Sequence, residues 1–109
     1  MKLNILWLPD ACGDLDEIYD YYVIRNPRAA ALLYNGILDE AEILRTNPRI
    51  APKEPSLEDA PREYRSLIVA KGKYKLVYTI LEEKSILIIH VFACRQNPAK
   101  LRLTVLSRL

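Results

Sequence analysis

Three runs of β-prone residues follow one another between Tyr64 and Leu101. Two short charged segments separate the runs, at Lys71–Lys73 and at Glu82–Ser85. This spacing is typical of antiparallel strands that are joined by tight turns. The pattern therefore predicts a three-stranded antiparallel meander, which the rest of the chain must cover.

Side chains alternate along the second strand of this meander. Positions 74, 76, 78 and 80 carry Tyr or aliphatic residues and share one face, whereas Lys75 stands on the opposite face. The third strand, Ile86–Cys94, is apolar at nearly every position, as expected of a central strand. We therefore expect one face of the sheet to pack against helices and the other face to be open and basic.

The chain before the meander predicts one short strand and two amphipathic helices. Lys2–Leu8 is an apolar run that ends at Pro9-Asp10, which suits a strand at the edge of the sheet. From Ala11 the apolar residues repeat with a helical period, and Asn26-Pro27 is a start signal for a second helix that stops at Asn47-Pro48. The apolar stripe is Ala11, Leu15, Ile18 and Tyr22 in the first helix, and Ala30, Leu33, Ile37, Ala41 and Leu44 in the second.

Only a few residues around Ile24-Arg25-Asn26 separate the two helices, so we expect an antiparallel helical hairpin that lies on the sheet. Pro48–Pro61 holds four prolines without a period and is expected to be a connecting loop. The predicted fold is a single α+β domain over residues 1–109. Its order is an N-terminal strand, the helical hairpin and the meander, with both helices on one face of the sheet.

Composition narrows the class of protein. A chain of 109 residues that is half apolar has material for one compact core. No run approaches the roughly 20 apolar residues that span a bilayer, and Met1-Lys2-Leu3-Asn4 does not open a signal peptide, so we expect a cytoplasmic protein. Cys12 and Cys94 have neither CxxC spacing nor a nearby His, which predicts two reduced, packed thiols, no metal site and no cofactor.

The net charge of +2 hides an asymmetry between the two parts of the chain. Met1–Pro61 carries 6 basic and 11 acidic residues, and Arg62–Leu109 carries 10 basic and 3 acidic residues. A basic sheet favours a polyanionic partner, which is either nucleic acid or an acidic protein segment. The alternative is a solvated face without a partner.

Two further features have a structural and a functional interpretation. The aromatic cluster in the hairpin, Tyr19, Tyr21, Tyr22 and Tyr34, resembles a stacking platform for bases, but its overlap with the apolar stripe favours packing. His90 stands alone in an apolar strand. This favours a partly buried imidazole with a hydrogen-bond partner over a catalytic role.

The order of these elements and five short segments together resemble the RelE/ParE superfamily of bacterial type II toxin–antitoxin toxins, whose ParE-like members include plasmid stabilisation proteins. The similarity covers roughly Leu3 to Leu101. The segments are Asp14-Leu15-Asp16-Glu17-Ile18 followed by Tyr21, Asn26-Pro27-Arg28-Ala29-Ala30, Tyr64-Arg65-Ser66-Leu67, Tyr74-Lys75-Leu76-Val77-Tyr78, and Val91-Phe92-Ala93-Cys94-Arg95-Gln96-Asn97-Pro98.

The resemblance implies one of two activities. RelE-like members cut messenger RNA in the ribosomal decoding site, and ParE-like members inhibit DNA gyrase without nuclease chemistry. Cleavage by 2′-hydroxyl attack needs proton transfer and cations that stabilise the phosphate charge. Arg65, Lys75 and Arg95 match cationic positions of the nucleases and would be catalytic if the protein is RelE-like.

The proton-transfer residue of the nucleases has no counterpart in this sequence. After Arg95 the chain contains no Tyr, His, Asp or Glu, and Leu101 stands about where the nucleases place a Tyr. Its loss should remove a general acid–base contribution of about 10²–10⁴-fold. The long hairpin with its Asn-Pro-x-Ala-Ala start also resembles ParE.

The resemblance therefore favours a ParE-like toxin that inhibits gyrase and is neutralised by a cognate antitoxin. Arg65, Lys75, Arg95 and Lys100 are the expected contacts to the antitoxin or the target. Two alternatives stay open, which are a ribosome-dependent endoribonuclease and a degenerate, non-toxic module that binds its antitoxin. Neither the target nor the oligomeric state follows from the sequence.

Overall fold

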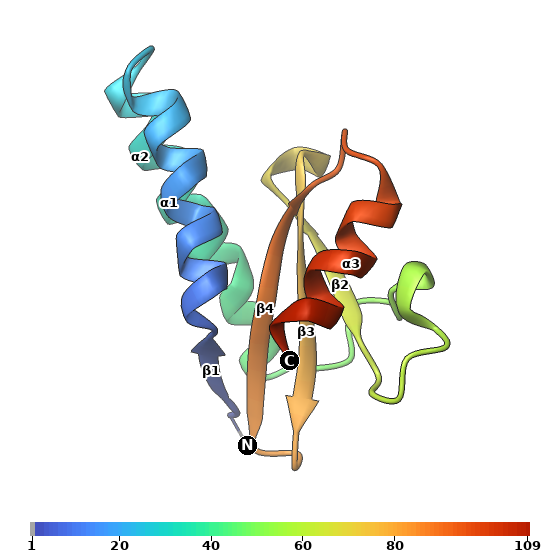
Figure 1. The fold of residues 1–109 in the computed structure, drawn as a ribbon. Coiled ribbons are helices and arrows are strands. Elements are labelled where there is room, and N and C mark those ends of the chain that lie inside the picture. Colours follow the sequence, from blue (N-terminus) through green and yellow to red (C-terminus); the bar gives the residue numbers. More distant parts are fainter. Residues whose placement is uncertain (1) are drawn as a thin grey trace.

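A helical hairpin and a C-terminal helix cover the two faces of one four-stranded sheet (Figure 1). The computed structural model describes residues 2–109. The strands are β1 (Asn4–Trp7), β2 (Arg65–Val69), β3 (Tyr74–Leu81) and β4 (Ser85–Ala93). The helices are α1 (Pro9–Val23), α2 (Pro27–Ala41) and α3 (Pro98–Arg108), with 3₁₀ turns at Glu42–Arg45, Pro55–Leu57 and Ala70–Gly72.

The sheet has the strand order β1-β4-β3-β2. β2, β3 and β4 form the predicted antiparallel meander, and β1 pairs in parallel with β4 at the edge. β4 is therefore a central strand, as its continuous apolar sequence predicted. The α+β fold class is confirmed, with a sheet that is mixed rather than wholly antiparallel.

The hairpin forms at the residues predicted from the sequence, with the second helix starting at Asn26-Pro27. The side chain of Asn26 accepts a hydrogen bond of 3.1 Å from the backbone N–H of Ala29, and Pro27 occupies the first helical position. Tyr19 of α1 meets Tyr34 of α2 edge to face at 5.9 Å, which supports the packing interpretation for this pair. The apolar stripes of both helices pack against the β3 and β4 side chains Leu76, Tyr78, Ile86 and Ile88.

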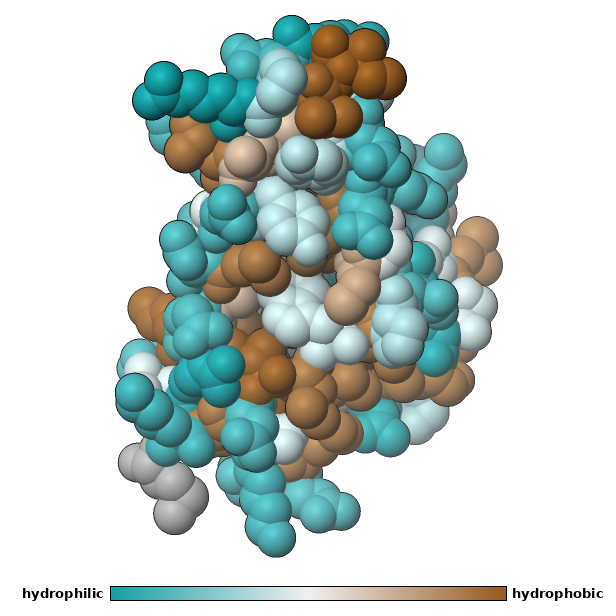
Figure 2. All heavy atoms as spheres, turned by 90° about the vertical axis from the view of Figure 1, so that its left-hand side faces the viewer, coloured by the Kyte–Doolittle hydropathy of each residue, from teal (hydrophilic) through white to brown (hydrophobic). Residues whose placement is uncertain are grey.

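The far end of the hairpin extends beyond the sheet (Figure 1). Figure 2 shows this side of the molecule, and brown apolar side chains gather at its top. Ile24 is 85% exposed and Leu32 is 66% exposed. The tip of the hairpin is therefore the part that the sheet does not cover.

The expectation of an open second face is wrong, because α3 lies on it. Leu101 and Val105 are fully buried against Val77, Ile89 and Phe92 on the side of the sheet opposite the hairpin. These strand residues are apolar and need cover, and α3 supplies it with an i, i+4 pair. The helix begins with a local signal, since Asn97 Oδ1 accepts a hydrogen bond of 2.9 Å from the backbone N–H of Ala99. The two predicted helices do share one face, and the third helix is an addition.

Two further expectations concern the cysteines and the membrane. Cys12 and Cys94 are free but exposed, so the prediction that they are packed is wrong. Within residues 2–109, no helix has the length and apolar character that crossing a bilayer requires.

Candidate binding cleft

The site begins at an edge of β4 that β1 leaves uncovered. β1 pairs with β4 only as far as Trp7 opposite Ile88, after which the chain turns into α1. Beyond this point side chains take over the hydrogen bonding of the β4 backbone. Asp14 Oδ2 accepts a hydrogen bond of 2.9 Å from the N–H of Val91, and Arg108 Nη1 donates one of 2.9 Å to the carbonyl of Ile89. Side chains from α1 and α3 thus satisfy backbone groups that a longer β1 would have paired.

Asp14, His90 and Arg108 form one hydrogen-bonded cluster at this edge. Arg108 holds the Asp14 carboxylate with both terminal nitrogens, at 2.7 and 2.9 Å. His90 Nδ1 lies 2.7 Å from Asp14 Oδ2. Burial raises the pKa of Asp14, but the hydrogen bonds from Arg108, His90 and Val91 outweigh it and lower the pKa to about 2.

The ionised carboxylate decides the tautomer of His90. An ionised Asp14 is only an acceptor, so Nδ1 of the imidazole must carry the hydrogen. Nε2 then keeps its lone pair in the neutral form and can accept a hydrogen bond. The side chain of His90 is 12% exposed and hydrogen-bonded, so the predicted partly buried imidazole with a hydrogen-bond partner is confirmed.

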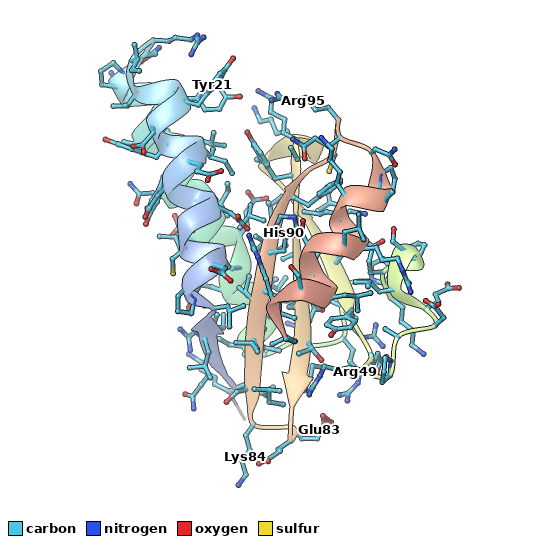
Figure 3. All side chains as sticks on the ribbon, in the orientation of Figure 1. Tyr21, Arg49, Glu83, Lys84, His90 and Arg95 are labelled. Atoms are coloured by element: carbon cyan, nitrogen blue, oxygen red, sulfur yellow. The ribbon has the colours of Figure 1, made fainter. Side chains whose placement is uncertain are left out.

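A cleft of about 250 Å³ opens beside this cluster, between α1 and the strands β3 and β4. Figure 3 shows Tyr21 on α1 and Arg95 at the end of β4 pointing toward each other, with His90 lower on β4. The lining combines two carboxylates, an imidazole, three phenols and one guanidinium. The residues are Asp14, Glu17, Ile18, Tyr21, Tyr22, Tyr74, His90, Val91, Ala93, Arg95 and Gln96.

Three tyrosines, Tyr21, Tyr22 and Tyr74, give the cleft phenol hydroxyls and aromatic rings. Burial, followed by a hydrogen bond with Tyr22, raises the pKa of Tyr74 to about 12. Tyr21 is half exposed, and the guanidinium carbon of Arg25 lies 4.2 Å from the centre of its ring. The Tyr21 ring of the cleft therefore already binds the guanidinium of Arg25 from the same chain.

Lys75, a predicted site residue, is held by a buried carboxylate. Its Nζ lies 2.7 Å from Glu54 Oε1, and Glu54 is 1% exposed. Ser66 Oγ donates to the same oxygen at 2.7 Å, and the N–H of Ser56 donates to Oε2 at 2.9 Å. Burial raises the pKa of Glu54, but the hydrogen bonds from Lys75, Ser66 and Ser56 lower it to about 2.

Arg65 is held on the opposite face of the sheet. It stands opposite Tyr78 on the hairpin side, whereas Lys75 stands opposite Phe92 on the α3 side. Arg65 Nη1 donates to the Ala51 carbonyl at 2.7 Å and Nη2 to Glu63 Oε1 at 2.9 Å. The structure therefore does not bring these two cations together.

The other two predicted residues are exposed. Arg95 lines the cleft, and Lys100 lies on α3. The four predicted residues thus occupy separate places, and only Arg95 belongs to the cleft.

Sequence reasoning missed most of the cleft. Asp14 and Glu17 are one helical turn apart on α1, and neither was among the predicted site residues. Arg108 joins Asp14 across 94 positions of sequence. Such a pair leaves no local signal, so only the folded chain reveals it.

A comparison with known protein families identifies the family of this chain. Residues 5–98 match the family described as "ParE toxin of type II toxin-antitoxin system, parDE". The chain belongs to this ParE toxin family. Membership confirms the resemblance to the RelE/ParE superfamily and implies a cognate antitoxin as partner.

Two solved structures share the fold of this ParE-family chain. One is described as the chromosomal ParDE TA system from P. aeruginosa, with a TM-score of 0.68 and 22% identity over 84% of this chain and 96% of that one. The other is a mutant of the E. coli toxin RelE in the free state, with a TM-score of 0.69 and 14% identity over 100% of this chain and 99% of that one. A search of curated proteins gave no match. At these identities the likeness shows the fold alone.

Proposed function

We propose that this chain is the toxin of a type II toxin–antitoxin module and that it inhibits DNA gyrase through surface contacts. Its membership in the ParE family supports the module, and the absence of an assembled nuclease site within the described residues supports the mode of action. The cognate antitoxin neutralises it by binding. Arg95 and Lys100 are the proposed basic contacts, because Glu63 and Glu54 already engage Arg65 and Lys75.

One observation carries the choice of gyrase over messenger RNA. A ribonuclease needs its cations to converge on one phosphate. Here Lys75 and Arg65 point to opposite faces of the sheet, and each is bound to protein acceptors. The described chain after Arg95 also holds no Tyr, His, Asp or Glu that would transfer a proton to the leaving group.

Paired activity assays test this proposal. Purified wild-type protein should inhibit the supercoiling of relaxed plasmid by gyrase, and it should leave ribosome-bound messenger RNA intact. Cleavage of the messenger without inhibition of gyrase would overturn the proposal.

A ribosome-dependent endoribonuclease is the second candidate. The observation in its favour is His90, whose Nε2 is available beside a cleft that Arg95 also lines. In that case Arg95→Lys should lower cleavage by about 10²-fold, because Lys keeps the charge but loses the bidentate hold on phosphate. The substitution leaves a surface position charged, so a loss of cleavage would not reflect unfolding.

A further inference from the structure

Of the two carboxylates that line the cleft, only Asp14 forms an ion pair within the described residues. Arg108 neutralises Asp14 through two hydrogen bonds. Glu17 stands one turn further along α1, lines the same cleft, and makes no ion pair with any of residues 2–109. One exposed carboxylate therefore lines the cleft without an ion pair of its own, and Arg108 acts on it only through a longer-range attraction.

The other groups around Glu17 suit a planar cation. In its neutral form His90 has a lone pair at Nε2, and the phenol oxygens of Tyr22 and Tyr74 can accept hydrogen bonds. Aromatic faces attract cations, and a guanidinium also stacks on them. Arg25 over the Tyr21 ring is an example of this contact within the same molecule.

We propose that this cleft receives the side chain of an arginine from a polypeptide partner. This inference rests on the proposed function, because the toxin family supplies the polypeptide partner. The guanidinium lies among Glu17, His90 and the tyrosines. Arginine fits better than lysine, since five N–H donors in one plane match several acceptors and a ring face at once.

Arg95 favours a carboxylate in the partner next to the entering arginine. It lines the other end of the cleft, near Tyr21 in Figure 3, and its charge repels a second cation there. A carboxylate close to the entering arginine in the partner's sequence matches Arg95. A free anion fits the cleft less well, because the Glu17 carboxylate repels it.

Nuclear magnetic resonance titration of the full chain tests the inference with small probes. N-acetyl-arginine amide should cause saturable shifts at the amides of Val91 and Ala93 and at the His90 ring. N-acetyl-norleucine amide, which is uncharged, should not. Glu17→Gln should weaken arginine binding about tenfold or more, since it removes a charge-assisted hydrogen bond. Glu58→Gln, which changes another exposed carboxylate outside the cleft, is the matched control and should bind as wild type.

Each other outcome overturns the inference. Equal shifts with norleucine would mean an apolar pocket, and saturable shifts with inorganic phosphate at the same residues would mean an anion site. Unchanged binding in Glu17→Gln, or no shift with any probe, would exclude the arginine site. Because the titration contains neither gyrase nor antitoxin, its failure leaves the proposed function standing, and a failed gyrase assay leaves the titration result intact.

Discussion

At the level of single residues, two carboxylates form ion pairs between parts of the chain that are distant in sequence. Glu54, in the loop before β2, holds Lys75 of β3, and Asp14 of α1 holds Arg108 of α3. Each carboxylate has its pKa lowered to about 2. Both therefore stabilise the folded state only while they are ionised.

The contribution of Glu54 has a definite pH window. Its ordinary pKa is 4.5 and its folded pKa is about 2, so its stabilisation is complete above about pH 4.5 and is lost as the pH falls toward 2. Glu54→Gln should lower the free energy of unfolding at pH 7 by about 3 kcal/mol, because Lys75 loses its buried partner. The variant should also lose less further stability than wild type between pH 4.5 and pH 2.

Urea unfolding followed by circular dichroism across this pH range measures both effects. Glu58→Gln, at an exposed position in the same loop, should behave as wild type. Parallel pH curves for wild type and Glu54→Gln would contradict the account of Glu54.

At the level of elements, α3 is the feature that sequence reasoning did not predict. The last predicted strand ends at Cys94 and no helix was predicted after it, although Asn97-Pro98 carries the same start signal as Asn26-Pro27. The first two helices have long apolar stripes, whereas α3 buries only Leu101 and Val105. A stripe of two residues is weak evidence, and the apolar face of β4 that required a cover was the stronger indication.

Two arginines of α3 offer a matched comparison of how this helix is held. Arg108 and Asp14 are each 15% exposed, whereas Arg102 and Asp59 are 39% and 73% exposed. Arg108→Gln should lower the free energy of unfolding by roughly 2–3 kcal/mol, since Asp14 loses its main partner and the Ile89 carbonyl loses a donor. Arg102→Gln should cost much less, because water solvates its partner.

Thermal unfolding of both variants measures this difference. Hydrogen exchange of the α3 amides then shows whether the loss is local to that helix. Equal destabilisation by the two substitutions would contradict the role given to the Asp14–Arg108 pair.

At the level of the whole molecule, the charge asymmetry between the acidic first part and the basic second part of the chain also stabilises the fold. Part of it is neutralised by ion pairs that join a basic residue of the second half to an acidic residue of the first. The pairs are Lys75 with Glu54, Arg102 with Asp59, and Arg108 with Asp14. The basic surface predicted from the sequence is therefore smaller than the residue counts suggest.

Sequence patterns predicted the fold well and the cleft poorly, for a physical reason. Strands and the hairpin leave periodic signals within a few residues, such as the alternation along β3 and the cap at Asn26. The cleft forms between α1 and the strands β3 and β4, and the contacts of the cluster beside it join residues 76 and 94 positions apart. Of the predicted site residues, only Arg95 lies in it.

The central proposal is that this ParE-family chain acts by surface contact and not by proton transfer. The most direct test is the inhibition of gyrase supercoiling by His90→Gln, because His90 is the residue of the cleft best placed to move a proton. Circular dichroism first establishes that the variant is folded. The account predicts that folded His90→Gln inhibits gyrase within about twofold of wild type, since general acid–base catalysis contributes about 10²–10⁴-fold where it operates. Loss of inhibition in the folded variant, or wild-type cleavage of ribosome-bound messenger without any inhibition of gyrase, would contradict it.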